Sequence, residues 1–276
     1  MGGTRWLTSA RVAPAMLLAC ALLAGCGADT ARSEPLGPPG TNLVFSEEFS
    51  GDELGDAWST CYWWQVDGGC TIASNDEEQW YRPEAVEVTD GMVVLTASDE
   101  PQRTTDGATL PFRSGVITTG HADNDVDAPG FEFTYGRVEA RVRFPDGDGT
   151  WPAVWLLSAD RTSLPEIDIV EWYGSVGTVL TAHVHQRIDG ERESARIDHV
   201  APDVAGAWHE VGVDWQADRV EFFFDGRSVG VVDDSDLIPS TPMYLIANLA
   251  LGGPAGDVDV DALPQTFAID WIRVWQ

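Results

Sequence analysis

The sequence predicts an all-β protein, a two-sheet antiparallel β-sandwich. Short segments in which apolar and polar residues alternate recur from residue 42 to the C-terminus, and this period of two is typical of half-buried strands. Gly, Pro and Asp separate the segments, with 28 Gly and 16 Pro in 276 residues. No stretch has a convincing amphipathic helical period. About ten short strands between turn residues favour two packed sheets over an α/β fold.

The clearest predicted strand covers residues 135–144, where Val138, Ala140 and Val142 share one face and Arg residues share the other. Asp225-Gly226 divides the apolar segment 220–232 and suits the tight turn of a hairpin. The other expected strands are 86–97, 114–119, 150–158, 166–172, 178–185, 208–215, 243–251 and 266–275.

The N-terminus predicts export. An apolar run behind Arg5 and Arg11 is too short to span a bilayer and ends in Leu23-Ala24-Gly25-Cys26. This ending resembles the bacterial lipoprotein signal, in which the Cys is lipidated, and an ordinary cleaved signal peptide is the alternative. We therefore expect a signal over 1–25, a lipid anchor at Cys26 as the membrane contact, a flexible tether over 26–41 and one domain over 42–276.

Cys61 and Cys70 form the cysteine pair of this domain. In an exported chain they predict a disulfide that pins a loop. A metal site is the less favoured alternative, because there is no CxxC motif and no neighbouring His.

The formal net charge is −29, and all 16 basic residues are Arg. Such a chain should repel nucleic acid and anionic membrane surfaces. The same negative field makes a heavily sulfated or carboxylated ligand less favourable than a neutral carbohydrate, although local Arg clusters could override it.

Three acids lie within six residues in the segment Glu166-Ile167-Asp168-Ile169-Val170-Glu171. Strict alternation would place Glu166 and Asp168 on one face and Glu171 on the other. One β-bulge around Ile169 and Val170 would return Glu171 to the acidic face. Two Glu side chains leaning together over Asp168 could then reach the separation of about 5–5.5 Å that a retaining glycosidase needs. An acidic solvent-facing edge or a calcium site are the alternative interpretations of the spacing.

The surroundings of this segment favour carbohydrate chemistry. Trp151 and Trp155 share a strand face, and sugar rings stack on such aromatic faces. His183 and His185 share one face of a later strand and could hydrogen-bond a sugar hydroxyl or the reacting acids.

At this point the sequence resembles glycoside hydrolase family 16, in particular its bacterial laminarinase-like (β-1,3-glucanase-like) members. The central match is the run 166–171, which looks like the ExDxxE signature of the family in its bulged form. Matches in family order also occur at 44–49, 75–81, 135–141, 149–157, around His183, at 248–253 and at 270–275.

The resemblance implies a jelly roll with a concave glycan-binding cleft. Glu166 would be the nucleophile, Glu171 the general acid and then base, and Asp168 the residue that assists the nucleophile. Substrate contacts are expected from Trp151, Trp155, His183, His185, Asn75 and Trp172. No catalytic cofactor is expected. A structural Ca²⁺ would involve Glu48, the Gly91 backbone and Asp270.

The predicted function is that of a surface-anchored or secreted, monomeric retaining endo-glycosidase acting on a neutral β-glucan with β-1,3 or mixed β-1,3-1,4 linkages. Alternatives are a transglycosylase on the same glycans, a hydrolase of agar- or carrageenan-type galactans, and a non-catalytic glycan-binding module. The segment 253–257 departs from the usual Trp-Pro-Gly loop of the family and leaves the cleft edge open to variation.

Overall fold

The computed structural model describes residues 37–64, 70–120 and 130–276. The predicted signal peptide, Cys26 and most of the tether lie outside these residues. Residues 37–276 form one compact unit. Residues 37–41 were assigned above to the tether, but they belong to this compact unit. Gly37 packs so closely on the Trp275 ring that a Cβ atom at this position would overlap the ring. Within the described residues, no helix is long and apolar enough to cross a membrane.

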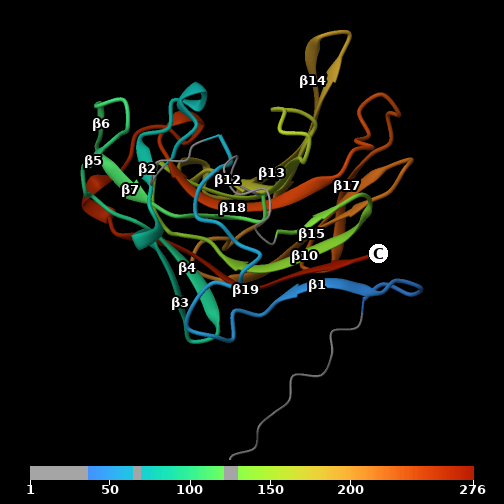
Figure 1. Cartoon of the computed structure of the whole chain (residues 1–276), viewed down its shortest axis with the longest axis horizontal. Coiled ribbons are helices and arrows are strands. Elements are labelled where there is room, and N and C mark those ends of the chain that lie inside the picture. Colours follow the sequence, from blue (N-terminus) through green and yellow to red (C-terminus); the bar gives the residue numbers. More distant parts are fainter. Residues whose placement is uncertain (1–36, 65–69, 121–129) are drawn as a thin grey trace, which may run out of the picture. The chain divides into compact units, whose positions relative to one another are not determined.

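Two antiparallel sheets form the body of this unit (Figure 1). The outer sheet has the order β17-β16-β15-β10-β19-β4-β3, with β1 also paired to β19. Its strands are β1 (Leu43–Glu47), β3 (Val86–Thr89), β4 (Met92–Ala97), β10 (Gly136–Arg143), β15 (Trp208–Trp215), β16 (Val220–Phe224), β17 (Arg227–Val232) and β19 (Gln265–Trp275).

The second sheet, here called the cleft sheet, has the order β14-β13-β12-β11-β18-β8, with β9 also paired to β18. Its strands are β8 (Val116–Thr118), β9 (Glu132–Phe133), β11 (Thr150–Ser158), β12 (Glu166–Trp172), β13 (Val179–Ile188), β14 (Glu191–Val200) and β18 (Met243–Leu251). Two small pairs lie beside the sandwich, β2 (Gln79–Tyr81) with β7 (Phe112–Ser114) and β5 (Gln102–Arg103) with β6 (Thr109–Leu110).

The all-β sandwich prediction is therefore confirmed. The hairpin at Asp225-Gly226 is also confirmed, because both residues have positive φ, 48° and 72°. The single strand expected over 86–97 is wrong: Asp90 and Gly91 have φ values of 52° and 74° and turn the chain between β3 and β4.

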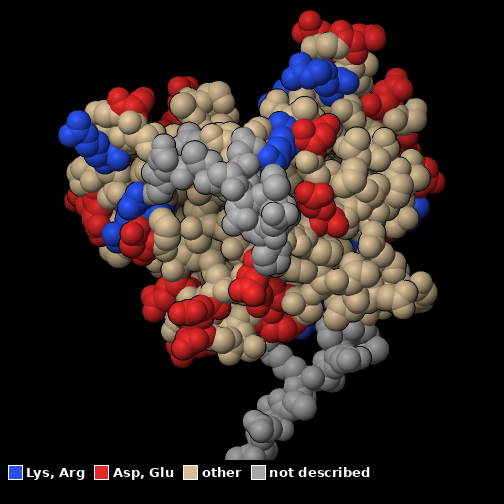
Figure 2. Space-filling model, viewed as in Figure 1, with Lys and Arg blue, Asp and Glu red and all other residues tan. Residues whose placement is uncertain are grey.

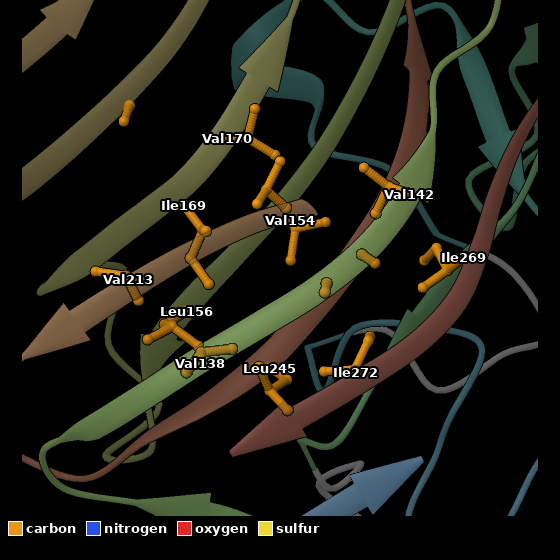
Figure 3. Packing of buried hydrophobic residues seen from close by; sticks show 14 of the residues in the cluster. Val138, Val142, Val154, Leu156, Ile169, Val170, Val213, Leu245, Ile269 and Ile272 are labelled. Carbon is orange, nitrogen blue, oxygen red and sulfur yellow. The ribbon is translucent and has the colours of Figure 1, made fainter. Parts of the chain in front are cut away.

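Apolar side chains from both sheets meet between them and form the main core (Figure 3). Val138 and Val142 of β10 and Ile272 of β19 project from the outer sheet, while Leu156 of β11 and Leu245 of β18 project from the cleft sheet. Each of these side chains is at most 1% exposed. This buried layer fixes which face of each cleft-sheet strand remains for function.

Candidate active site

A β-bulge in β12 places all three acids of this strand on one face. Glu166 pairs with Leu157 and Asp168 with Trp155, but the register to β11 then shifts by one residue before Glu171 pairs with Ala153. Ile169 and Val170 both point into the core as a result (Figure 3). A bulge reverses the alternation beyond it, so the predicted bulge and its position are confirmed.

The three acids line a cleft of about 690 Å³, which lies on the face of the cleft sheet opposite the core. Its lining includes Trp151 and Trp155 of β11 and His183 and His185 of β13. A carboxylate row, two imidazoles and two indoles therefore meet in one concave site, as the alternation of each strand predicted.

Glu171 is held from several directions. Trp151 Nε1 donates to Glu171 Oε1 at 2.8 Å, and the Tyr173 hydroxyl lies 3.4 Å from the same oxygen. Thr181 Oγ1 and His183 Nδ1 lie 3.5 and 2.7 Å from Oε2. A carboxyl group with this many neighbours has a fixed orientation toward the cleft.

Glu166 and Asp168 are both disposed to hold a proton. Burial raises the pKa of Glu166 to about 8, and the charge of Asp168 adds to the increase, while His185 and Arg192 oppose it. Burial, followed by the charge of Glu171, raises the pKa of Asp168 well above its usual value. Desolvation and like-charge repulsion are the two effects that keep clustered carboxyl groups protonated.

The two histidines stack with ring centroids 5.2 Å apart, and both face the cleft. Burial lowers the pKa of His183, but its contact with Glu171 and the charge of Asp168 outweigh this and raise it overall. Burial lowers the pKa of His185 to about 4. His185 Nε2 lies 3.2 Å from Asp168 Oδ2 and 3.7 Å from Glu166 Oε1, and His183 Nδ1 lies 3.7 Å from Asp168 Oδ2, so both imidazoles contact Asp168.

Asp168, His183 and His185 also place ligand atoms within 4.8 Å of one another, and they are the one such group of His, Cys, Asp or Glu side chains within the described ranges. This group belongs to the acid cluster itself.

The two cleft tryptophans are positioned differently. Trp151 is partly exposed, whereas Trp155 is 7% exposed and its Nε1 donates to Asn248 Oδ1 at 2.8 Å. Asn248 Nδ2 in turn donates to the Tyr81 hydroxyl at 3.0 Å. This chain of hydrogen bonds fixes the Trp155 ring in the floor of the cleft.

Asn75 lines the cleft, and its Nδ2 donates to the buried carboxylate of Glu77 at 3.2 Å. Trp172 does not line the cleft. It is buried in the main core, where its ring lies 6.0 Å from that of Phe144. The bulge explains this correction: once Glu171 faces the cleft, the next residue must face the core.

Several cleft residues were not predicted. Asn248 fixes Trp155, and Tyr173 contacts Glu171. The sequence pattern around the three acids did not indicate either residue. Further examples are Tyr62, Trp63 and Trp64 from the segment after Cys61, and Arg161 and Arg192. An aromatic run between two cysteines was the available sequence signal for the first three.

Comparison with known proteins identifies the family. The model for glycosyl hydrolases family 16 matches residues 84–273, more than half of the chain. The chain belongs to this family.

One similar protein is an endo-1,3-1,4-beta-glycanase, EglC, of Rhizobium meliloti. It is 36% identical over 230 residues, which cover 77% of this chain and 47% of that protein. The chain thus spans about half the length of that protein. A beta-glucanase of Rhodothermus marinus is 27% identical over 95% of this chain and 92% of its own length. The laminarinase catalytic domain of Thermotoga maritima superposes with a TM-score of 0.72 at 27% identity and covers 86% of this chain and 98% of that domain.

The residues that the family resemblance implied for calcium do not fit a cation. Arg273 forms a two-pronged ion pair with Glu48, at 2.7 and 2.8 Å. Arg141 Nη1 contacts Asp270 Oδ2 at 2.5 Å. Gly91 lies in the turn between β3 and β4. Ca²⁺ takes six to eight oxygen ligands. Here guanidinium groups form ion pairs with both carboxylates, and their positive charge would repel a cation.

The predicted disulfide between Cys61 and Cys70 is not formed in the structure. The two side chains are neighbours. Burial raises the pKa of Cys70, and the adjoining Cys61 adds to this increase. The backbone N–H of Tyr62 donates to Cys70 Sγ at 3.3 Å.

Proposed function

We propose that the protein hydrolyses internal bonds of a β-glucan with β-1,3 or mixed β-1,3-1,4 linkages, with retention of configuration. The observation that carries this proposal is the row of Glu166, Asp168 and Glu171, which the bulge directs into a cleft lined by tryptophan. The activities named for the relatives, an endo-1,3-1,4-beta-glycanase and a beta-glucanase, support the choice of glycan.

In this mechanism Glu171 donates its proton to the leaving glycosidic oxygen while a Glu166 carboxylate oxygen attacks the anomeric carbon. The bond to the leaving sugar breaks as the glycosyl–Glu166 ester forms. Glu171 then takes a proton from water, whose oxygen displaces Glu166 from the anomeric carbon. The contacts of Trp151 and His183 with Glu171 keep this group oriented in both steps.

The attacking form of Glu166 is the carboxylate. In the free protein Glu166 holds its proton up to about pH 8, mainly because it is buried. We therefore expect the rate to increase with pH as this proton is lost. His185 and Arg192 favour the ionised form and limit the shift.

The aromatic and amide groups of the cleft would bind the sugars. Trp151 offers a partly exposed ring beside Glu171, and Trp155 offers a fixed one beside Asp168. Asn75 offers a hydrogen-bonding amide on the side of the cleft formed by residues 71–77. The family resemblance supports these roles, and the position of Trp172 in the core removes it from the set.

The test is reducing-sugar release and product length on laminarin, mixed-linkage β-glucan, agarose and carrageenan. Glu166→Gln should lower cleavage by at least about a thousandfold, whereas Glu87→Gln, an exposed acid on β3 of the outer sheet, should not. NMR of the first product should show retained anomeric configuration. Equal activity of wild type and Glu166→Gln would refute the assignment, and products longer than the substrate would indicate transglycosylation.

We also propose that the chain is exported, with a lipid on Cys26 and residues up to 36 as a tether. The apolar run ending in Leu23-Ala24-Gly25-Cys26 supports this. Metabolic labelling with palmitate should mark the wild-type protein and not Cys26→Ser; equal labelling would contradict the anchor.

After export the neighbouring thiols of Cys61 and Cys70 are proposed to pair as a disulfide. Each would lose one hydrogen to an oxidant of the exported compartment, and a bond of this kind holds a short loop. Thiol labelling before and after reduction of the secreted protein tests this, and full labelling before reduction would contradict it.

A further inference from the structure

The wall of the cleft formed by β13 and β14 is rich in arginine on one side. Along β14 the sequence runs Glu191-Arg192-Glu193-Ser194-Ala195-Arg196, so alternation separates the basic residues from the acidic ones. Ser194 Oγ lies 2.5 Å from His185 Nδ1, and His185 lines the cleft. The face with Arg192, Ser194 and Arg196 therefore looks into the cleft.

The opposite face of β14 carries the glutamates and turns away from the cleft. Ile197 lies on that face and packs against Gly230 of β17, so closely that a Cβ atom at Gly230 would overlap its side chain. Glu191 and Glu193 lie on the same face as Ile197, so they do not neutralise the arginines on the other face of the strand. Glu166 and Asp198 form ion pairs with Arg192 and Arg196, and Asp168 is close enough to Arg192 for that charge to oppose the increase that burial causes in the Asp168 pKa.

Arg192 lines the cleft, Arg196 lies on the same face of β14, and both have incomplete ion pairs. Arg192 Nη2 is 3.4 Å from Glu166 Oε1, a long contact, and its side chain is 55% exposed. Arg196 Nε contacts Asp198 Oδ1 at 2.7 Å, with both side chains more than half exposed. An exposed pair such as Arg196 with Asp198 contributes little stability, and the contact of Arg192 with Glu166 is long, so both guanidinium groups remain able to bind a solute anion.

A third arginine adds like charge at the same place. Arg187 of β13 pairs directly with Arg192 across the strands, and both are exposed. Like charges directly opposite one another destabilise a sheet. An anion between them would remove this cost.

The Arg-bearing wall contrasts with the rest of the molecule. The chain has 45 acids against 16 Arg, and in Figure 2 blue surface gathers in the region of β14 beneath its acidic tip. The negative field of the protein as a whole repels anions. Arginine recognises carboxylate and sulfate groups through paired N–H donors, which fits a site built for an anion at this one wall.

We propose that the glycan bound in the cleft carries acidic substituents, carboxylate or sulfate, and that Arg187, Arg192 and Arg196 bind them. This inference rests on the proposed function, and it replaces the neutral substrate expected from net charge with an acid-substituted one. The competing explanation is that the arginines only balance the charge of the catalytic acids.

The decisive experiment measures binding and cleavage of three forms of one polymer. Laminarin, laminarin with a minority of its C6 groups oxidised to carboxylate, and lightly sulfated laminarin are compared at low ionic strength. Binding is measured in the Glu166→Gln background, where no cleavage occurs, with and without Arg192→Gln plus Arg196→Gln. Arg219→Gln is the matched control, since Arg219 is half exposed and ion-paired to Asp214 in the outer sheet.

We expect one anionic form to bind about tenfold more tightly than laminarin, a preference equivalent to about 1.4 kcal/mol. The double Arg variant should abolish the preference and the Arg219 control should keep it. The preferred arm identifies carboxylate or sulfate. Salt should weaken binding of that form only.

Equal binding of all three forms, or a preference that survives in the double variant, would overturn the proposal. Cleavage is scored separately in the wild-type background. Cleavage of neutral laminarin without any anionic preference would leave the proposed function intact and this inference wrong. A preference for binding an anionic form, without cleavage of any form, would support this inference and contradict the proposed function.

Discussion

At the scale of single residues, the protonation of the carboxylate row is the property that controls the chemistry. Glu166 is buried and near Asp168, and its pKa is raised to about 8. Burial cannot be changed by a conservative substitution, but the charge of Asp168 can. That makes Asp168 the residue through which the pH dependence can be tested.

Asp168→Asn should move the acidic limb of the pH profile of kcat/KM to lower pH by about one unit. Removing a negative charge next to Glu166 makes its ionisation easier, so its pKa falls. The kcat should fall as well, because Asp168 no longer assists the nucleophile. Asp198→Asn, which changes an exposed acid paired to Arg196, is the control. An unchanged acidic limb would contradict this account of the shift.

The raised pKa of Glu166 also predicts how stability depends on pH. Below its ordinary pKa near 4.5, Glu166 is protonated in both the folded and the unfolded state. Between 4.5 and about 8 the unfolded chain loses this proton while the folded chain keeps it, so stability falls as pH rises. Above about 8 the folded state carries the full cost of a buried charge.

Glu166→Gln removes this cost. Its Tm should exceed that of the wild type at pH 8 by roughly 3–8 °C and match it at pH 4. Thermal scans by circular dichroism at several pH values measure the difference. A variant less stable than the wild type at pH 8 would show that the carboxylate contributes favourable contacts that outweigh its burial.

At the scale of the secondary-structure elements, β12 shows how much the sequence could reveal. Three acids with one out of phase required a bulge, and the apolar pair Ile169 and Val170 was the place where both side chains could enter the core. The same reasoning excludes Trp172 from the cleft, since it follows Glu171 directly. The error at Trp172 came from not applying the bulge beyond Glu171.

β14 could not be predicted in the same way. It is an edge strand, and its polar residues are exposed on both faces along the first half, so there is no apolar alternation to detect. Arg192 and Arg196 were missed for this reason. Edge strands with charged side chains are common because they resist pairing with other chains, and such strands have a weak sequence signature.

Deleting Ile169 tests the bulge as an element. The deletion leaves Glu166, Asp168 and Glu171 at a strict spacing of two residues, so all three acids should stay on the cleft face without a bulge and kcat should remain within about tenfold of the wild-type value. Ile169→Val keeps the bulge, and it should cost about 1 kcal/mol of stability while most activity remains. Circular dichroism establishes whether the deletion variant folds. A folded deletion variant whose kcat is lower by about a hundredfold or more would contradict the view that the bulge serves only to return Glu171 to the cleft face.

At the scale of the whole molecule, charge is the dominant feature. The chain has a net charge of −29, and the compact unit of residues 37–276 contains 43 of its 45 acids and 13 of its 16 Arg. Self-repulsion of this size destabilises the compact state. The charge pattern was readable from composition, but where the Arg residues gather depends on the sandwich topology, which brings β13 and β14 to one wall of the cleft.

Salt should therefore stabilise the protein at neutral pH. Raising NaCl from 20 to 500 mM shortens the Debye length from about 20 Å to about 4 Å and screens the repulsion between acids. Salt also weakens the ion pairs, such as Glu48 with Arg273, but repelling acids outnumber Arg by nearly three to one. We expect an increase in Tm of roughly 5 °C. The control is the same titration at pH 4, near the isoelectric point of about 4.1, where the net charge is small and the salt effect should vanish. A salt-independent or falling Tm at pH 7 would mean that local ion pairs, and not net repulsion, set the stability of the domain.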